Sequence, residues 1–219
     1  MQAVIPILFL FLMMLQLPFG PVSQEKLKEE TSPVKGWRSI THFAVPATRY
    51  SKTGNVIKAE SLGSRSSLFK DIEKTKKDYP VLSWKWKVSN VVRSAIETRK
   101  DRHDAAARVM VVVFEREKGF HWLRGTHEGP KIEYIWANRL PKGHIFDHPD
   151  EMECKIFVLE SGEGKAGQWV SERRNLRKDF IEAFQASFAG VVAIGIQTDT
   201  DHSNEMVTAY YSEPMLKKK

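Results

Sequence analysis

The sequence predicts an all-β protein, a two-sheet antiparallel β-sandwich with one short helix near residues 175–188. Residues Val81–Val88 alternate apolar and polar side chains, which is the pattern of a strand with one buried face. Residues Arg108–Phe114 are apolar on both faces, as in a covered central strand. Only Asn175–Phe188 has helical spacing, while short extended segments separated by Gly, Pro, Asn and Asp fill the rest.

The remaining strands are expected at short apolar segments bounded by turn residues. The turn at 52–54 joins Thr48–Ser51 to Asn55–Ala59 as a hairpin. Asn175 is a suitable N-cap for the helix. Further strands are expected at Ile132–Ala137, Lys155–Glu160, Gln168–Glu172, Val191–Gln197 and Val207–Ser212. The last two are expected to pair as a closing hairpin.

The N-terminus is typical of a secretory signal peptide. Residues 3–17 are apolar apart from Pro6 and Gln16, and this run is shorter than the ~20 residues of a bilayer span. Cleavage is expected near Ser23. The chain then divides into a signal peptide (1–23), an exposed polar leader (24–36) and a single sandwich domain (37–216). An uncleaved membrane anchor is the alternative, because no Lys or Arg precedes the apolar run.

Composition limits how the protein can be stabilised and which partners it can bind. The mature chain, just under 200 residues, is large enough for one domain with its own core. A single cysteine excludes an internal disulfide, and Cys154 is expected to be a small buried hydrophobe. The net charge is +7, but the basic residues are mixed with acidic ones except at 217–219. This scattered distribution argues against nucleic-acid binding. The excess could favour acidic glycans or other anionic envelope polymers, or serve solubility alone.

A polar loop near the C-terminus is the first candidate site. Asp199, Asp201 and Asn204 offer hard oxygen ligands at the short spacing that calcium prefers. The loop is not an EF-hand, since Asn204 stands where Gly is required. Asp199 and Asp201 are therefore the candidate calcium ligands. Hydrogen bonding to sugar hydroxyls and a purely conformational role for the turn are the alternatives.

A second candidate lies at the start of the central strand. Asp104 and Arg108 are placed to pair with each other or to meet the loop at Asp199. A buried structural ion pair is the alternative to a functional role. No nucleophile, phosphate-binding or dinucleotide motif is present in the sequence.

Aromatic and acidic residues supply the remaining candidates. Trp122, in a Gly-rich loop, is the best candidate for an exposed contact, because the alternation around Trp84 and Trp86 indicates core packing. Three glutamates lie in or beside predicted strands: Glu133, Glu160 and Glu172. Any two of these could face one cleft at the ~5–9 Å that glycoside hydrolysis requires, and the sequence singles out no pair.

Five segments together resemble an uncharacterised family of exported bacterial proteins, a domain of unknown function. They are, in order, 79–88, 103–109, 132–136, 168–175 and 198–202, and the resemblance spans about 37–215. It implies a Gram-negative source, a periplasmic or secreted location and a strand pattern similar to the jelly-roll of carbohydrate-binding modules. It implies no activity. The family's polar positions correspond to Asp104, Arg108, Asp199 and Asp201. His103 and His202 depart from the expected acidic residue and Asn, which makes calcium less favoured.

The leading hypothesis is a non-catalytic envelope module that holds a glycan or related ligand at the loop end. Its contact residues would be Asp104, Arg108, Asp199, Asp201, Asn204 and Trp122. The alternative is a hydrolase of envelope carbohydrate that uses a carboxylate pair such as Asp104 with Glu160 or Glu172. A third possibility, a structural partner-binding domain, would show a large exposed apolar patch.

Overall fold

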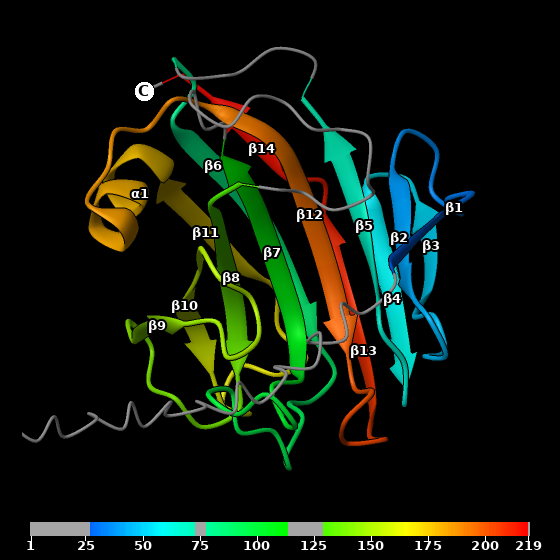
Figure 1. The fold of residues 1–219 in the computed structure, drawn as a ribbon. Coiled ribbons are helices and arrows are strands. Elements are labelled where there is room, and N and C mark those ends of the chain that lie inside the picture. The colour runs from blue at the N-terminus through cyan, green and yellow to red at the C-terminus, as the bar shows by residue number, and fades with distance from the viewer. Residues whose placement is uncertain (1–26, 73–77, 114–128, 219) are drawn as a thin grey trace, which may run out of the picture.

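The computed structural model describes residues 27–72, 78–113 and 129–218, whose strands form two layered sheets with helix α1 at one side (Figure 1). The larger sheet contains, in spatial order, β1 (Leu27–Glu30), β2 (Arg38–His42), β5 (Ser66–Asp71), β12 (Val191–Asp199), β7 (Ala105–Val113), β8 (Lys131–Ala137), β10 (Cys154–Ser161) and β9 (Ile145–Asp147). The smaller sheet contains β11 (Val170–Asn175), β6 (Val81–Val88), β13 (Met206–Ser212), β4 (Val56–Leu62) and β3 (Arg49–Thr53), with β14 (Met215–Lys217) paired to β6.

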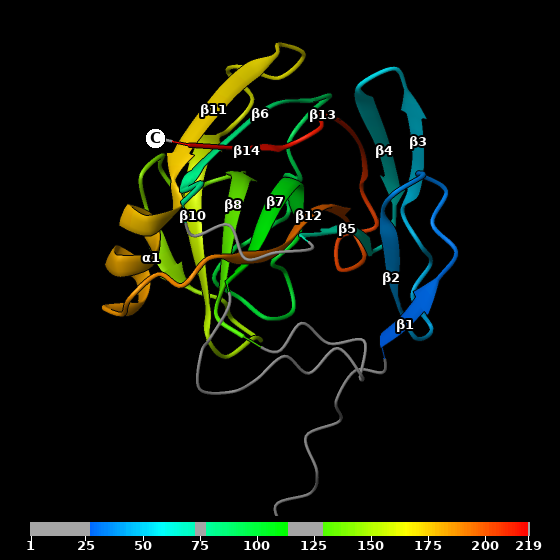
Figure 2. The same ribbon diagram turned by 90° about the horizontal axis from the view of Figure 1, so that it is seen from above.

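This arrangement confirms the predicted all-β, jelly-roll-like sandwich. Seen from above, β6 and β11 lie on one side of the core, while β7, β8 and β12 lie on the other (Figure 2). The described strands pair antiparallel with one exception, the parallel pair of β8 and β10. The parallel pair follows from the chain crossing over through β9, which then pairs antiparallel with β10.

The two strands that carried the prediction behave as their patterns require. Strand β6 buries its apolar positions, and Trp84 and Trp86 lie in the core between the sheets. Every residue of β7 is buried: Val109 and Val111 belong to the main core, and Met110 and Val112 belong to a second apolar cluster on the other face of the sheet. The turn around Gly54 joins β3 to β4 as an antiparallel hairpin, and Gly54 has the positive φ of +57° that such a turn demands. Cys154 is buried, as expected.

The helix is shorter than its apolar spacing predicts. Helix α1 covers Leu176–Phe184, and the Asn175 side chain accepts a hydrogen bond from the Lys178 backbone, so the predicted N-cap is confirmed. The helix ends because Gln185 adopts a left-handed conformation with φ of 52°. The apolar residues beyond it, such as Phe188, still pack into the core without helical geometry.

The predicted closing hairpin is wrong. Strand β12 belongs to the larger sheet and β13 to the smaller one, so the loop at 200–205 crosses between the layers. The burial patterns explain the difference, because β12 is buried on both faces while β13 is buried at alternate positions. A polar turn between two apolar runs is compatible with either connection.

The N-terminal boundary also differs from the expected leader. Strand β1 pairs antiparallel with β2, and Val34 is buried in the main core, so much of the segment 24–36 is attached to the sandwich. The predicted signal peptide (1–23) lies outside the described residues. Within the described part of the chain, no helix is long and apolar enough to cross a membrane.

Candidate functional site

Asp104, just before β7, holds the loop between β12 and β13. Its carboxylate accepts hydrogen bonds from the backbone N–H of His202 (3.3 Å) and of Ser203 (2.8 Å), and from the His202 ring Nδ1 (3.0 Å). The Asp104 side chain is only 1% exposed. A buried carboxylate that satisfies two backbone donors and an imidazole fixes the conformation of this crossing loop.

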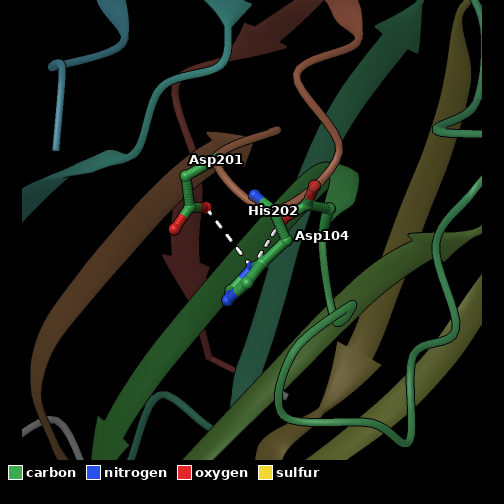
Figure 3. A group of neighbouring side chains, drawn as sticks. All are labelled: Asp104, Asp201 and His202. Atoms are coloured by element: carbon green, nitrogen blue, oxygen red, sulfur yellow. Dashed lines mark hydrogen bonds and ion pairs between the residues drawn. The ribbon is translucent and has the colours of Figure 1, made fainter.

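Asp201 and His202 complete a three-residue cluster with Asp104 (Figure 3). The His202 Nδ1 lies 3.7 Å from Asp201 Oδ1, and the other Asp201 oxygen lies 3.8 Å from Arg65 Nη1. The Asp201 side chain is 10% exposed, and its Oδ1 accepts no hydrogen bond from any described residue. Asp104 precedes β7 and Asp201 follows β12, and the antiparallel pairing of these strands brings the two residues together at one edge of the larger sheet.

The two carboxylates of the cluster have pKa values shifted in opposite directions. Burial raises the pKa of Asp201 to about 6, and the negative charge of Asp199 adds to this. Burial opposes ionisation of Asp104 too, but hydrogen bonds from His202 and Ser203 lower its pKa to about 2. Asp104 and then Asp201 in turn raise the pKa of His202.

Arg108 and Asp199 form a buried ion pair beneath this cluster. Arg108 donates from Nε to Asp199 Oδ1 (3.0 Å) and from Nη1 to Glu133 Oε2 (2.9 Å), and its Nη2 also contacts the His103 carbonyl oxygen. The Arg108 and Asp199 side chains are 2% and 0% exposed. A glycan at the surface cannot touch either group, so the geometry favours the structural alternative for both.

The predicted calcium ligation finds no support in this geometry. Both oxygens of Asp199 accept hydrogen bonds from Arg108, and Oδ1 also accepts one from the Ala105 N–H. A calcium ion at Asp199 would have to displace a buried guanidinium. Asn204 lies at the exposed tip of the loop with φ of 56°. Trp122 falls outside the described residues.

A carboxylate pair occupies a different part of the sandwich. Glu160 on β10 is in register with Trp136, and Glu172 on β11 with Trp84. Because both tryptophans lie in the core between the sheets, both glutamates point into the space between the layers. Glu160 Oε1 accepts hydrogen bonds from two lysines, Lys142 (2.6 Å) and Lys165 (3.0 Å).

The two glutamates have opposite pKa shifts. Burial raises the pKa of Glu172 to about 6. The positive charge of Lys142 lowers this pKa in part, whereas the negative charge of Glu160 raises it further. Burial acts on Glu160 as well, yet its hydrogen bonds from Lys142 and Lys165 lower its pKa. Glu172 Oε1 and the nearby Trp86 indole N–H are buried without a hydrogen bond of normal geometry among the described residues. Such a split is the pattern of an acid and a base in one site.

The outer face of the six-stranded sheet, hereafter the basic face, carries exposed aromatic and cationic side chains. Trp169, directly before β11, is 44% exposed, and its ring centroid lies 6.4 Å from that of Tyr210. Lys87 Nζ lies 4.4 Å from the Tyr210 centroid and 5.5 Å from that of Trp169. The outward positions of these strands also hold the cationic residues Arg49, Lys58, Lys85 and Arg173.

Sequence reasoning missed His202 as a site residue and missed the basic face. Alternation in β13 could have revealed Tyr210, because Val207, Ala209 and Tyr211 are buried and Tyr210 must then point outward. Nothing in the sequence shows that Trp169 lies beside Tyr210, since β11 and β13 are neighbours of β6 rather than of each other. His202 was visible in the loop, but its contact with Asp104 depends on tertiary structure.

The structure is similar to several solved structures, all at low sequence identity. No curated protein matches its sequence. Among solved structures it is similar to the xyloglucanase domain of NopAA from Sinorhizobium fredii, solved with cellobiose (11% identity, TM-score 0.46, 90% of this chain and 100% of that chain). It is also similar to a family 12 xyloglucanase from Bacillus licheniformis (8%, 0.47, 88% and 97%). A third is the family 11 carbohydrate-binding module of the cellulase Lic26A-Cel5E from Clostridium thermocellum (10%, 0.40, 89% and 95%).

These similarities concern the arrangement of strands at very low identity, and none assigns a ligand to this chain. They include both hydrolases and binding modules. Comparison of the sequence with protein families confirms the resemblance seen in the five segments. Residues 35–215 match the family described as "Protein of unknown function (DUF3047)", and the chain belongs to that family.

Proposed function

We propose that this protein is an exported, non-catalytic carbohydrate-binding module of the bacterial envelope that contacts an acidic glycan through its basic face. The observation that carries the proposal is the exposed Trp169 beside Tyr210, with Lys87 over both rings. In contrast, the loop end first considered as the glycan site places Asp104 and Arg108 out of reach of a surface ligand.

The chemistry of the basic face suits a charged polysaccharide. Aromatic rings present flat apolar area with a polar edge, which suits the apolar face of a sugar ring. The outward positions of the described strands of this sheet hold one acid, Glu60, and six cationic residues: Arg49, Lys58, Lys85, Lys87, Arg173 and Lys217. Lys58 is partly neutralised by Glu60 at 2.8 Å. The remaining excess attracts carboxylate or sulfate groups along a polymer, in a salt-dependent way.

Affinity electrophoresis and calorimetry test this proposal. The purified protein is tested with alginate and polygalacturonate as acidic polymers, and with mixed-linkage β-glucan and dextran as neutral ones. Wild type is expected to bind the acidic polymers and to lose affinity as salt increases. The double variant Trp169→Ala/Tyr210→Ala is expected to lose about tenfold or more in affinity, because two stacking surfaces disappear.

The matched control is Phe43→Ala, which removes another exposed aromatic side chain (75% exposed) away from the basic face. It should bind like wild type. Absence of retention on every acidic polymer, or equal loss in Phe43→Ala, would reject the basic face as the contact surface. Retention on neutral polymers alone would keep a carbohydrate module but reject an acidic ligand.

A second candidate function is hydrolysis of envelope carbohydrate, favoured by the opposite pKa shifts of Glu160 and Glu172. In this alternative Glu172, protonated below about pH 6, is the general acid, and Glu160, ionised beside its two lysines, is the base or nucleophile. The two residues replace the pairs containing Asp104 that the sequence suggested. Asp104 is committed to the loop through three hydrogen bonds.

Release of reducing sugar from the same polymers between pH 4 and 8 tests this candidate. Activity should fall as the pH rises through about 6, since Glu172 then loses its proton. Glu172→Gln should lower kcat by about 10²–10⁴-fold, the range for a lost general acid. A wild-type protein that binds a polymer without releasing sugar at any pH would reject hydrolysis and leave the binding module.

A further inference from the structure

Three side chains at the crossing loop present donor atoms to a common point. They are Asp104, Asp201 and His202, and one ligand atom from each lies within 4.8 Å of the others. Figure 3 shows both carboxylates turned toward the same ring nitrogen of His202. Asp104 enters from the start of β7, whereas Asp201 and His202 follow β12 directly. The cluster is therefore built by two separate segments held by the larger sheet.

The separations agree with donors around a single small ion. Ligands bound at ~2.0–2.2 Å with angles between square and tetrahedral lie about 2.8–3.6 Å apart. The distance from His202 Nδ1 is 3.0 Å to Asp104 Oδ1 and 3.7 Å to Asp201 Oδ1. The second distance lies just above that range, so a small shift of the Asp201 carboxylate toward His202 would bring it within the range. The three donor atoms all lie within 4.8 Å of one another. The cluster is thus close to a ligating geometry without rearrangement of the loop.

An independent observation also points to a missing partner. Asp201 Oδ1 is buried, its side chain is nine-tenths buried, and no described donor forms a hydrogen bond with it. On the other side of the carboxylate, Arg65 Nη1 lies 3.8 Å from Oδ2. A buried carboxylate oxygen without a hydrogen bond is costly, so its orientation toward the imidazole calls for a positive charge there.

We propose that Asp104, Asp201 and His202 bind one divalent transition-metal ion, of which Zn²⁺ is the best match. An imidazole nitrogen with two carboxylate oxygens suits zinc or manganese better than calcium, which takes oxygen ligands. Two carboxylates and a neutral imidazole balance the charge of a divalent ion. The ion would replace the proton on His202 Nδ1. This site differs from the calcium site expected at Asp199, whose oxygens bind Arg108.

The ion would fasten the loop that connects the two sheets. The backbone N–H groups of His202 and Ser203 already donate to Asp104, so the loop is positioned before the ion arrives. A preorganised site needs little ordering of its ligands on binding. Metal binding is independent of the glycan proposal, because the basic face lies on the outer side of the other sheet.

Calorimetry and thermal melting with metal salts alone test the proposal. The purified protein, stripped with a chelator, is titrated with ZnCl₂, MnCl₂ and CaCl₂. One Zn²⁺ per chain is expected to bind more tightly than Ca²⁺ and to raise the Tm. Asp201→Asn and His202→Ala should each weaken zinc binding about tenfold or more. Both side chains are outside the main core, so these variants are expected to fold.

The matched control is His144→Ala, which removes an exposed histidine beside Phe146 on another part of the surface. It should bind zinc like wild type. Failure to bind Zn²⁺ or Mn²⁺ would overturn the proposal. So would binding that persists in both Asp201→Asn and His202→Ala, or that is lost in His144→Ala, because the ion would then be held elsewhere.

Discussion

The Arg108 guanidinium donates to the Asp199 carboxylate from Nε at 3.0 Å, and both side chains are almost completely buried. The pair joins β7 to β12, and the same guanidinium reaches Glu133 on β8 at 2.9 Å. Three adjacent strands of the larger sheet are thus tied by one cation. Burial favours the neutral form of arginine, but the charges of Asp199 and Glu133 raise the pKa of Arg108, so it stays charged.

Replacing Arg108 by methionine should destabilise the protein by about 3–5 kcal/mol, because the buried Asp199 carboxylate loses its cation and Glu133 keeps only its pair with Lys131. The free energy of unfolding in urea measures this. The control is Arg93→Met, which breaks an exposed pair with Glu163 at 3.0 Å and should change stability far less than Arg108→Met. Adding Asp199→Asn to Arg108→Met should recover part of the loss. Equal effects of Arg108→Met and Arg93→Met would contradict a structural role for the buried pair.

Glu172→Gln should stabilise the protein at neutral pH. The folded-state pKa of Glu172, about 6, exceeds its ordinary value of 4.5, so the proton binds more tightly to the folded state. The stability linked to that proton is fully present below about pH 4.5 and is lost as the pH rises through 6. Glutamine removes this loss, which we expect to be about 1 kcal/mol after allowing for screening at a partly exposed group.

Urea unfolding at pH 4 and pH 7 measures the effect of Glu172→Gln. The variant and wild type should be nearly equal at pH 4 and should differ at pH 7. Glu182→Gln, on the exposed side of α1, changes the same charge and should show no such pH dependence. A variant less stable than wild type at pH 7 would show that the ionised form of Glu172 is favoured by the fold.

Gly195 in β12 lies too close to its neighbours to accept a side chain. A Cβ there would approach the Phe69 ring to 2.5 Å and Met110 Cε to 2.8 Å. Gly195→Ala should therefore lower stability by about 1–3 kcal/mol through overpacking, which a thermal melt detects. Gly164→Ala is the control, since nothing lies within 4 Å of its Cβ position. The double variant Gly195→Ala/Phe69→Leu should regain stability if the ring is the obstacle.

Gln185→Gly should stabilise the end of α1. Gln185 has φ of 52°, in the left-handed region that costs a non-glycine residue about 1 kcal/mol. Its backbone N–H donates to Ile181 O, and glycine retains that bond. The Tm should rise, whereas Ala183→Gly, two residues earlier inside the helix, should lower stability by about 1 kcal/mol. A fall in Tm for Gln185→Gly would show that its side chain outweighs the backbone strain.

The local sequence determined the strands and the helix. Alternation in Val81–Val88 encodes one buried face, and β6 has these predicted bounds. The apolar run after Arg108 encodes two buried faces, and the predicted strand Arg108–Phe114 begins three residues after the observed start of β7 at Ala105. Asn175 set the start of α1 because its side chain caps a backbone N–H three residues later. These features depend on residues near one another in the chain, and local patterns carry that information.

Only the tertiary structure decided which elements meet. Alternation shows that a strand has a buried face but does not name its neighbour, so β12 and β13 were assigned to one hairpin although they lie in different sheets. The pairing of Arg108 with Asp199 joins residues 91 positions apart, and the Asp104–His202 bond spans 98. The facing of Glu160 and Glu172, and the contact of Trp169 with Tyr210, likewise follow from strand order and register. Sites built across strands and sheets are products of long-range packing, which periodicity along the chain cannot specify.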